Sequence, residues 1–231
     1  MVQALLGSLR SSGDPEIDKA VYDNTLKEKE RGFSVGPFTQ AQLSEKFGTL
    51  WVASRRFGVS QGFRSDGSRK IRSVDDLSEF GINSTISVDE KVDLGGVDRI
   101  LATGKTLANS VDDHRHVKVP NGSGGYFEGE LHSDWSLEDA RSIQGRTVDL
   151  EAAYKNLVTR MSDAPFSIFG VFNPETNLPE LWHSVALMFG ASGAVYGFNR
   201  AAVALRRIMI VLFHLHASSF FDDYVQEDLS A

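Results

Sequence analysis

Apolar and polar positions follow two different periods along the chain, and each change of period marks the boundary of an expected element. The first helix is well delimited, because Asp14-Pro15 supplies an N-cap and a first-turn proline and Gly32 supplies a terminator. Thr39 and Gln42 have the spacing of a capping box, which predicts a second helix. The elements expected up to residue 109 are helices over residues 16–31, 39–47 and 96–109 and strands over residues 51–63 and 70–77, joined by a turn at Asp66-Gly67.

The second half of the chain has a more regular pattern. The elements expected there are a short strand ending at Asp149, a helix over residues 151–161, a hairpin over residues 165–187, a helix over residues 192–213 and a strand leading to Asp222. The hairpin is expected because turn-forming residues at 173–177 separate two apolar runs. The order strand, helix, hairpin, helix, strand predicts an α+β fold in which an antiparallel sheet packs on helices.

Composition excludes several classes of chemistry. The 231 residues include no cysteine, so disulfides, zinc-thiolate sites and thiol nucleophiles are excluded. The net charge of −7 argues against a protein that coats nucleic acid without specificity. The most apolar segment, residues 201–213, is too short to span a bilayer and contains Arg206 and Arg207. We therefore expect a soluble intracellular protein that has no membrane partner.

An unusual acidic pair lies near the end of the sequence, within Phe220-Phe221-Asp222-Asp223-Tyr224. Aromatic residues favour a half-buried strand, and aspartate favours a turn, so the pair is expected where a strand enters a tight turn. Two like charges about 4 Å apart repel by about 4 kcal/mol at an effective dielectric near 20. A raised carboxyl pKa, a basic partner or a cation must compensate for this repulsion, and carboxylate oxygens of this kind suit Mg²⁺. The alternative is a simple acidic surface turn.

A basic segment precedes an acidic one in the first half of the chain. Residues 55–72 contain six basic residues and one acidic residue. One interpretation is a solvated face of a hairpin. Lys70 and Arg72, however, are two positions apart and therefore share one side of the expected strand.

Four segments resemble the motifs of reverse transcriptases of the retrotransposon type, and they occur in that family's order. They are Lys70-Ile71-Arg72-Ser73-Val74-Asp75-Asp76 for the fingers motif, Gly145 to Lys155 for motif A, Leu187-Met188-Phe189-Gly190 for motif B, and Phe220-Phe221-Asp222-Asp223 for motif C. Each motif alone is weakly specific, and the resemblance depends on their joint order and spacing.

The resemblance implies the fingers and palm of a right-hand polymerase over residues 51–231, preceded by a helical lead-in over residues 1–50. It implies two Mg²⁺ ions, with Mn²⁺ as a substitute, held chiefly by Asp149 and Asp222 and assisted by Asp223. Such ions stabilise the attacking and leaving oxygens of nucleotidyl transfer. The implied partners are a deoxynucleoside triphosphate (dNTP) and an RNA or DNA template with its primer.

The resemblance also implies roles for residues that bind the nucleotide. Arg72 would bind triphosphate oxygens, since its planar fork matches phosphate, and Lys70 would assist. Tyr154, the aromatic residue of motif A, would press against the sugar and reject a 2′-hydroxyl. Phe189 would pack on the sugar or base, and Gly190 would let the backbone approach the nucleotide closely.

The chain departs from the family pattern in three ways. Met188 replaces the usual proline of motif B, and Ser73 replaces the proline that often follows the fingers arginine. The sequence ends eight residues after Asp223, so a thumb is expected to be absent from it. Two alternatives remain open: a retroelement remnant that only binds nucleotide or nucleic acid, and an RNA-directed RNA polymerase.

Overall fold

The computed structural model describes residues 2–89, 91 and 95–229. The chain divides into two compact units, the first formed by residues 1–90 and 152–197 and the second by residues 91–151 and 198–231. Each unit combines helices with β-sheet, so the fold class is α+β. The first 50 residues belong to the same unit as the segments that follow them, and no unit boundary lies at residue 51.

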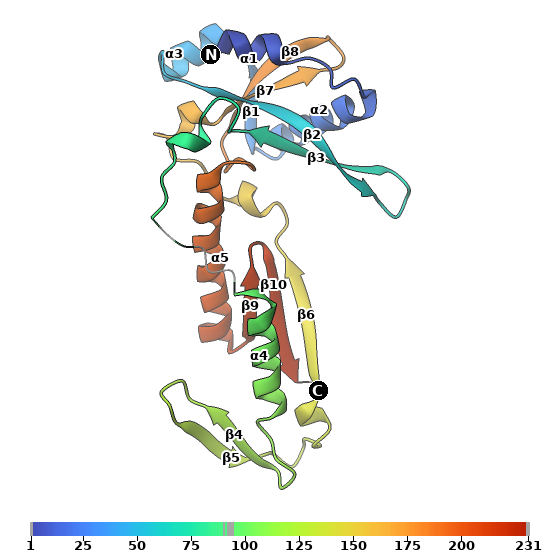
Figure 1. The fold of residues 1–231 in the computed structure, drawn as a ribbon, viewed down its shortest axis with the longest axis vertical. Coiled ribbons are helices and arrows are strands. Elements are labelled where there is room, and N and C mark those ends of the chain that lie inside the picture. The colour runs from blue at the N-terminus through green and yellow to red at the C-terminus, as the bar shows by residue number, and fades with distance from the viewer. Residues whose placement is uncertain (1, 90, 92–94, 230–231) are drawn as a thin grey trace. The chain divides into compact units, whose positions relative to one another are not determined.

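A five-stranded sheet forms the centre of the first unit (Figure 1). Its strands, in spatial order, are β1 (Ser34–Phe38), β8 (Leu178–Ser184), β7 (Ile168–Asn173), β2 (Ala53–Phe63) and β3 (Arg69–Asp76). Neighbouring strands are antiparallel except for β2 and β7, which are parallel. The single antiparallel sheet expected from the sequence is therefore wrong: the β7–β8 hairpin joins a mixed sheet, and the acidic pair belongs to another sheet.

Helices cover both faces of this sheet. They are α1 (Val2–Ser8), α2 (Pro15–Glu30) and α3 (Gln40–Phe47). Successive residues of β7 point to opposite faces. Phe169 belongs to the same buried cluster as Val21 of α2, whereas Ile168 belongs to the cluster that contains Leu5 of α1 and Leu43 of α3. Both faces of β7 are thus buried, which explains its nearly continuous apolar sequence.

The predicted helix ends are confirmed where capping side chains defined them. The Asp14 carboxylate accepts hydrogen bonds from the backbone N–H groups of Glu16 and Ile17 at the start of α2. At the start of α3, Thr39 and Gln42 make both bonds of a capping box. These caps satisfy backbone donors that the first turn of a helix leaves free.

The second unit has a three-stranded antiparallel sheet, and its elements complete the fold. In spatial order, its strands are β6 (Ile143–Asp149), β10 (Asp223–Leu229) and β9 (His216–Phe220). The helices of this unit are α4 (Gly96–Ala108) and residues 198–213 of α5 (Ser192–Phe213). A separate hairpin consists of β4 (His116–Pro120) and β5 (Tyr126–Glu130). Short 3₁₀ helices are η1 (Asn83–Thr85) and η3 (Ala153–Asn156), with η2 (Asp139–Arg141) and η4 (Ala164–Phe166).

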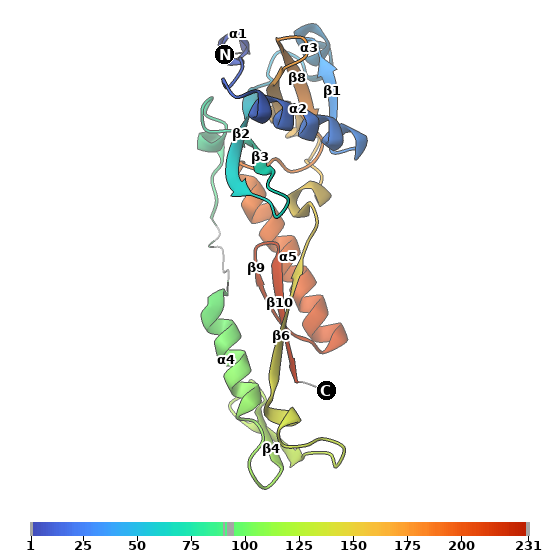
Figure 2. The ribbon, with the colours of Figure 1, turned by 90° about the vertical axis from the view of Figure 1, so that its right-hand side faces the viewer.

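The central strand β10 packs against both helices of this unit. The Tyr224 hydroxyl donates a hydrogen bond of 3.1 Å to the Ala202 carbonyl of α5. Glu227 packs beside Gly104 of α4, where an added Cβ would lie 3.0 Å from the carboxylate. Because positions 224 and 227 face opposite sides of a strand, α5 and α4 cover opposite faces, as Figure 2 shows.

The helix predicted over residues 151–161 is wrong. Ala152 adopts a left-handed φ of 55°, and only η3 forms after it. Beyond η3 the backbone is extended: the Leu187 N–H donates to the Leu157 carbonyl at 2.8 Å, and the Thr159 N–H donates to the Val185 carbonyl at 3.0 Å. Pairing with a distant segment therefore overrides a helical pattern of apolar residues.

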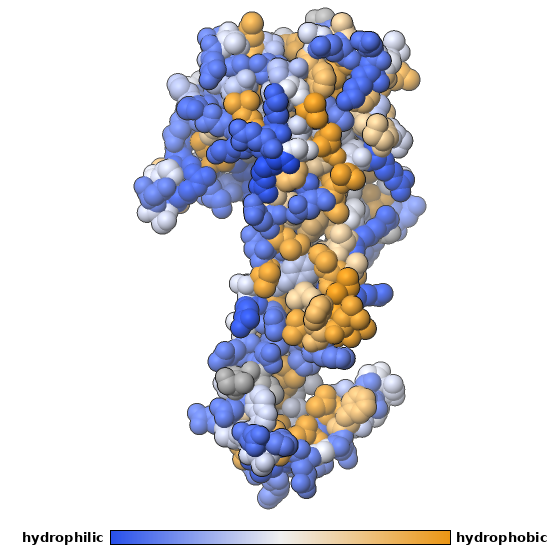
Figure 3. Space-filling model, turned by 180° about the vertical axis from the view of Figure 1, so that it is seen from behind, coloured by the Kyte–Doolittle hydropathy of each residue, from blue (hydrophilic) through white to orange (hydrophobic). Residues whose placement is uncertain are grey.

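Apolar side chains remain exposed near the end of α5. They are Leu205, Ile208, Ile210, Val211, Leu212 and Phe213. Figure 3 shows apolar side chains gathered over this part of the helix. None of the helices in the described part of the chain combines the length and the hydrophobicity needed to cross a bilayer.

Candidate active site

Strand pairing in the second unit brings two of the three predicted catalytic carboxylates together. Asp223, the first residue of β10, lies directly opposite Asp149, the last residue of β6. Directly opposed residues in an antiparallel pair point to the same face, with Cα atoms about 4.5–5.5 Å apart. The Leu150 N–H also donates a hydrogen bond of 3.3 Å to the Asp222 carbonyl. Sheet register therefore joins two aspartates that are 74 positions apart in the sequence (223 − 149).

The third carboxylate occupies a tight turn. Phe220 pairs with Asp223 across the β9–β10 hairpin, so Phe221 and Asp222 form a two-residue loop. Phe221 has a φ of 53°, a conformation that a bulky residue adopts at a cost of about 1–3 kcal/mol. Its ring meets that of Phe220 edge to face at 5.0 Å between centroids. Strained residues of this kind are concentrated at functional sites, and this one positions Asp222.

The acids are accessible to solvent. Asp149 and Asp223 are exposed and Asp222 is half-buried. Like charges directly opposite each other destabilise a sheet, and a cation between them would remove that cost. Carboxylate oxygens are the ligands that Mg²⁺ uses, commonly one or two together with phosphates of a substrate, so the donors present suit that ion. Within the described residues, no three His, Asp or Glu side chains are already gathered around one point that could hold a metal.

Three of the predicted nucleotide-binding residues form one cluster in the first unit. The Arg72 guanidinium lies over the Phe189 ring at 5.1 Å from its centroid. The Tyr154 ring meets Phe189 edge to face, with 5.9 Å between centroids and an interplanar angle of 89°. Phe189 is 38% exposed, so the aromatic surface between the other two residues is open to a ligand. These residues come from the segments assigned to the fingers motif, motif A and motif B.

Gly190 occupies a position that other residues fit poorly. Its φ is 115°, and an added Cβ would collide with the Asp75 carbonyl oxygen. Asn83 fixes the same turn, because its side-chain amide donates to the Gly190 carbonyl at 3.0 Å and its side-chain oxygen accepts from the Ser192 N–H at 2.9 Å. The Asp75 N–H in turn points to the Phe189 carbonyl at 3.3 Å. The Phe189-Gly190 turn is thus held directly against strand β3.

Lys70 and Arg72 share the exposed face of β3, and both line a cavity of about 350 Å³. The other charged residues of that cavity are Lys27, Glu28, Arg31, Arg64 and Lys155. Six of the seven charged side chains are basic. This excess of positive charge suits an anionic ligand that carries several phosphates.

A buried ion network, which no sequence pattern indicated, lies behind this cavity. The Arg56 side chain is 1% exposed and makes a two-pronged contact with Asp75, at 2.7 and 3.0 Å. Arg56 also bonds to Glu28 at 2.9 Å, and Glu28 contacts Lys155 at 3.2 Å. Burial alone would lower the pKa of Arg56, but Asp75 and Glu28 outweigh it and raise that pKa. The interpretation of the whole basic run as a solvated hairpin face is therefore wrong for Arg56.

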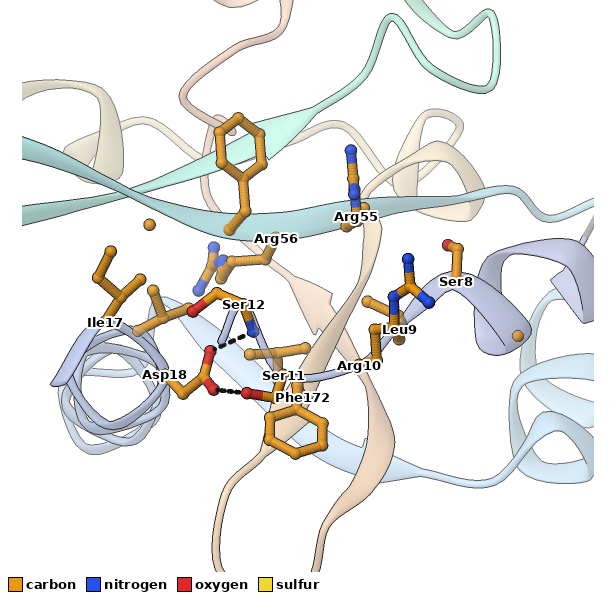
Figure 4. A pocket seen from close by; sticks show the side chains of 15 residues that line it. Ser8, Leu9, Arg10, Ser11, Ser12, Ile17, Asp18, Arg55, Arg56 and Phe172 are labelled. Carbon is orange, nitrogen blue, oxygen red and sulfur yellow. Dashed lines mark hydrogen bonds between the residues drawn. The ribbon is translucent and has the colours of Figure 1, made fainter. Parts of the chain in front are cut away.

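A second cavity of the first unit, of about 450 Å³, lies between α2, β2, β7 and residues 7–12 (Figure 4). The segment is held by Asp18, which accepts hydrogen bonds from the Ser11 hydroxyl and, at 2.9 Å, from the Ser12 N–H. Of the described residues that line it, none is among those predicted for catalysis or nucleotide binding.

Comparison of the chain with models of known protein families, and with curated proteins, finds no match.

Proposed function

We propose that the chain is the fingers and palm portion of an RNA-directed DNA polymerase, which adds a deoxynucleotide to the 3′-hydroxyl of a primer. The observation that carries this proposal is the register that sets Asp223 opposite Asp149 and leaves Asp222 in the adjoining turn. Motifs A and C of a reverse transcriptase must supply their acids to one place, and this register meets that requirement.

In the proposed reaction the primer 3′-oxygen bonds to the α-phosphorus of a dNTP while the bond to pyrophosphate breaks. Asp149 and Asp222 would hold the divalent cations, with Asp223 sharing the ligation as the cross-strand neighbour of Asp149. When bound, two such cations lower the pKa of the primer hydroxyl and stabilise the charge on the entering and leaving oxygens. The carboxylates themselves act by holding negative charge at a fixed position.

The residues of the first unit would bind the nucleotide. Arg72 and Lys70 would contact triphosphate oxygens from the basic cavity that they line. Phe189 would pack against the sugar, and Tyr154, which contacts Phe189 edge to face, would block a 2′-hydroxyl. Gly190 leaves the backbone of the same turn open to close approach.

The decisive experiment is primer extension by the purified chain on an RNA template in the presence of Mg²⁺. Asp149→Asn and Asp222→Asn are each expected to reduce incorporation by about a thousandfold or more, because each removes a metal-binding charge worth several kcal/mol in the transition state. Asp98→Asn is the matched control, since Asp98 is an exposed acid in the first turn of α4. That variant should retain the activity of the unchanged chain.

The outcomes separate the possible functions. Undiminished extension by Asp149→Asn would refute the metal assignment. Arg72-dependent binding of dNTP without any extension would identify a protein that only binds nucleotide, as expected of a retroelement remnant. Equal incorporation of ribonucleotides and deoxyribonucleotides would favour an RNA-directed RNA polymerase, because Tyr154 would then exclude nothing.

A further inference from the structure

A cavity of about 380 Å³ in the second unit is lined by basic and hydroxyl side chains from three elements. Its polar lining consists of Arg99 and Thr103 of α4, Arg206 and Arg207 of α5, and His216 and Ser218 of β9. None of the described residues that line it is acidic. We refer to it as the arginine cavity.

These side chains come from three elements that meet around β9, an edge strand of the three-stranded sheet. Arg99 and Thr103 are four residues apart on α4 and therefore lie on one side of that helix. Arg206 and Arg207 lie in the last turns of α5, which ends at Phe213. Ser218 of β9 also lines the cavity, and this residue is 6% exposed.

Arg206 and Arg207 of α5 have no acidic partner among the residues that the structure describes. Arg206 is half-buried and Arg207 is exposed. Neither makes an ion pair or a side-chain hydrogen bond with any residue in the described part of the chain. Arg56 in the first unit, by contrast, contacts two carboxylates. Neighbouring like charges repel each other, and a bound external anion would relieve that repulsion.

We propose that the arginine cavity binds a phosphate group. Two guanidinium forks present parallel N–H donors that match phosphate oxygens, and hydroxyl groups beside them can donate further hydrogen bonds. The phosphate can come from the backbone of a nucleic acid strand or from a free phosphorylated anion. The site is separate from the carboxylates, because His216 is the first residue of β9 and the Phe221-Asp222 turn follows its last residue, Phe220, about 13 Å further along the strand. The proposal holds whether or not the chain is a polymerase.

The first test measures binding of a fluorescently labelled single-stranded RNA to the full chain, by anisotropy, in a buffer with EDTA and without dNTP. Replacing both arginines (Arg206→Gln with Arg207→Gln) is expected to weaken binding about tenfold. The slope of log K against the logarithm of the salt concentration should become shallower by about 0.7, the contribution of one phosphate contact on a single strand. A double variant with both arginines changed to lysine keeps the positive charges but lacks the planar guanidinium groups. Its loss of affinity for RNA should be smaller than that of the glutamine variant.

The matched control removes two exposed basic charges of the same unit that do not line the cavity, by Lys105→Gln with Arg146→Gln. Its affinity for RNA should stay within twofold of the unchanged chain. An equal loss in both double variants, or no loss in either, would overturn the proposal. Circular dichroism and a matching melting temperature establish that each variant is folded. The loss of RNA affinity on replacing Arg206 and Arg207 should also be seen in a chain that carries Arg72→Ala. This result would show that the site is distinct from the proposed dNTP site.

The second test distinguishes the two sources of phosphate by titrating pyrophosphate calorimetrically. If pyrophosphate binds the unchanged chain, displaces RNA and fails to bind the Arg206→Gln, Arg207→Gln variant, the site takes small anions. If RNA affinity depends on the two arginines and pyrophosphate does not compete, the site takes backbone phosphates. A double variant that binds both probes as tightly as the unchanged chain would rule out the site altogether.

Discussion

Replacing Arg56 by methionine should destabilise the first unit more than any exposed charge substitution. Arg56 makes four hydrogen bonds through its guanidinium, two of them to Asp75, whose side chain is 3% exposed. Methionine fills a similar volume but leaves the Asp75 carboxylate buried without its partner. Breaking a buried pair from one side costs about 3–5 kcal/mol, a large fraction of the 5–15 kcal/mol by which domains are usually stable.

Urea unfolding followed by tryptophan fluorescence suits this measurement. Trp51 and Trp182 are 8% and 0% exposed and both belong to the first unit, so the emission change reports chiefly on the unfolding of that unit. For Arg56→Met, the urea concentration at the midpoint of unfolding should fall. The slope of the unfolding free energy against urea concentration should stay constant, because the surface exposed on unfolding is unchanged. The control is Lys19→Met, which removes an exposed ion pair to Asp23 and should leave the midpoint where it is.

A double variant tests the reason for the loss. Arg56→Met combined with Asp75→Asn removes both charges, so the double variant should be more stable than the sum of the single effects predicts by at least about 1 kcal/mol. Strict additivity, or a loss below about 1 kcal/mol for Arg56→Met alone, would refute the conclusion that an uncompensated buried carboxylate is the cause.

Three further outcomes are expected. Burial lowers the pKa of His183 to about 4, below the ordinary value of about 6.5, so the unfolded chain binds its proton first and stability should fall between pH 6.5 and pH 4. In urea titrations, the free energy of unfolding of His183→Leu should fall over that pH window by about 2 kcal/mol less than that of the unchanged chain. An identical pH dependence in both proteins would contradict this. Gly190→Ala should lower the melting temperature and weaken dNTP binding, because its Cβ would collide with Asp75, whereas Gly193→Ala in α5 should be neutral or stabilising. In primer extension, Tyr154→Ala should relax selection against ribonucleotides by about tenfold or more, and an unchanged preference would remove its role as a sugar gate.

Sequence reasoning succeeded where a residue's conformation depends on its near neighbours. The caps at Asp14 and Thr39 lie where they were predicted, and α5 spans the predicted residues. The turn at Asp222 was also predicted from local residue preferences. The same reasoning failed over residues 151–161, where a helical pattern of apolar positions belongs to an extended segment. It also did not predict the β4–β5 hairpin.

The sequence by itself determined the helix boundaries, the tight turn that carries Asp222, and the identity of the acids and the basic cluster. These features depend on interactions between residues that are close in the sequence. Capping residues, turn residues and the hydrophobic period indicate such interactions directly. Only the tertiary structure decided that Asp149 pairs with Asp223, that Arg56 is buried beside Asp75, and that Arg206 and Arg207 line one cavity with residues of α4 and β9. Each of these depends on which distant strands and helices pack together, and a shift of one residue in register would turn every such side chain to the opposite face.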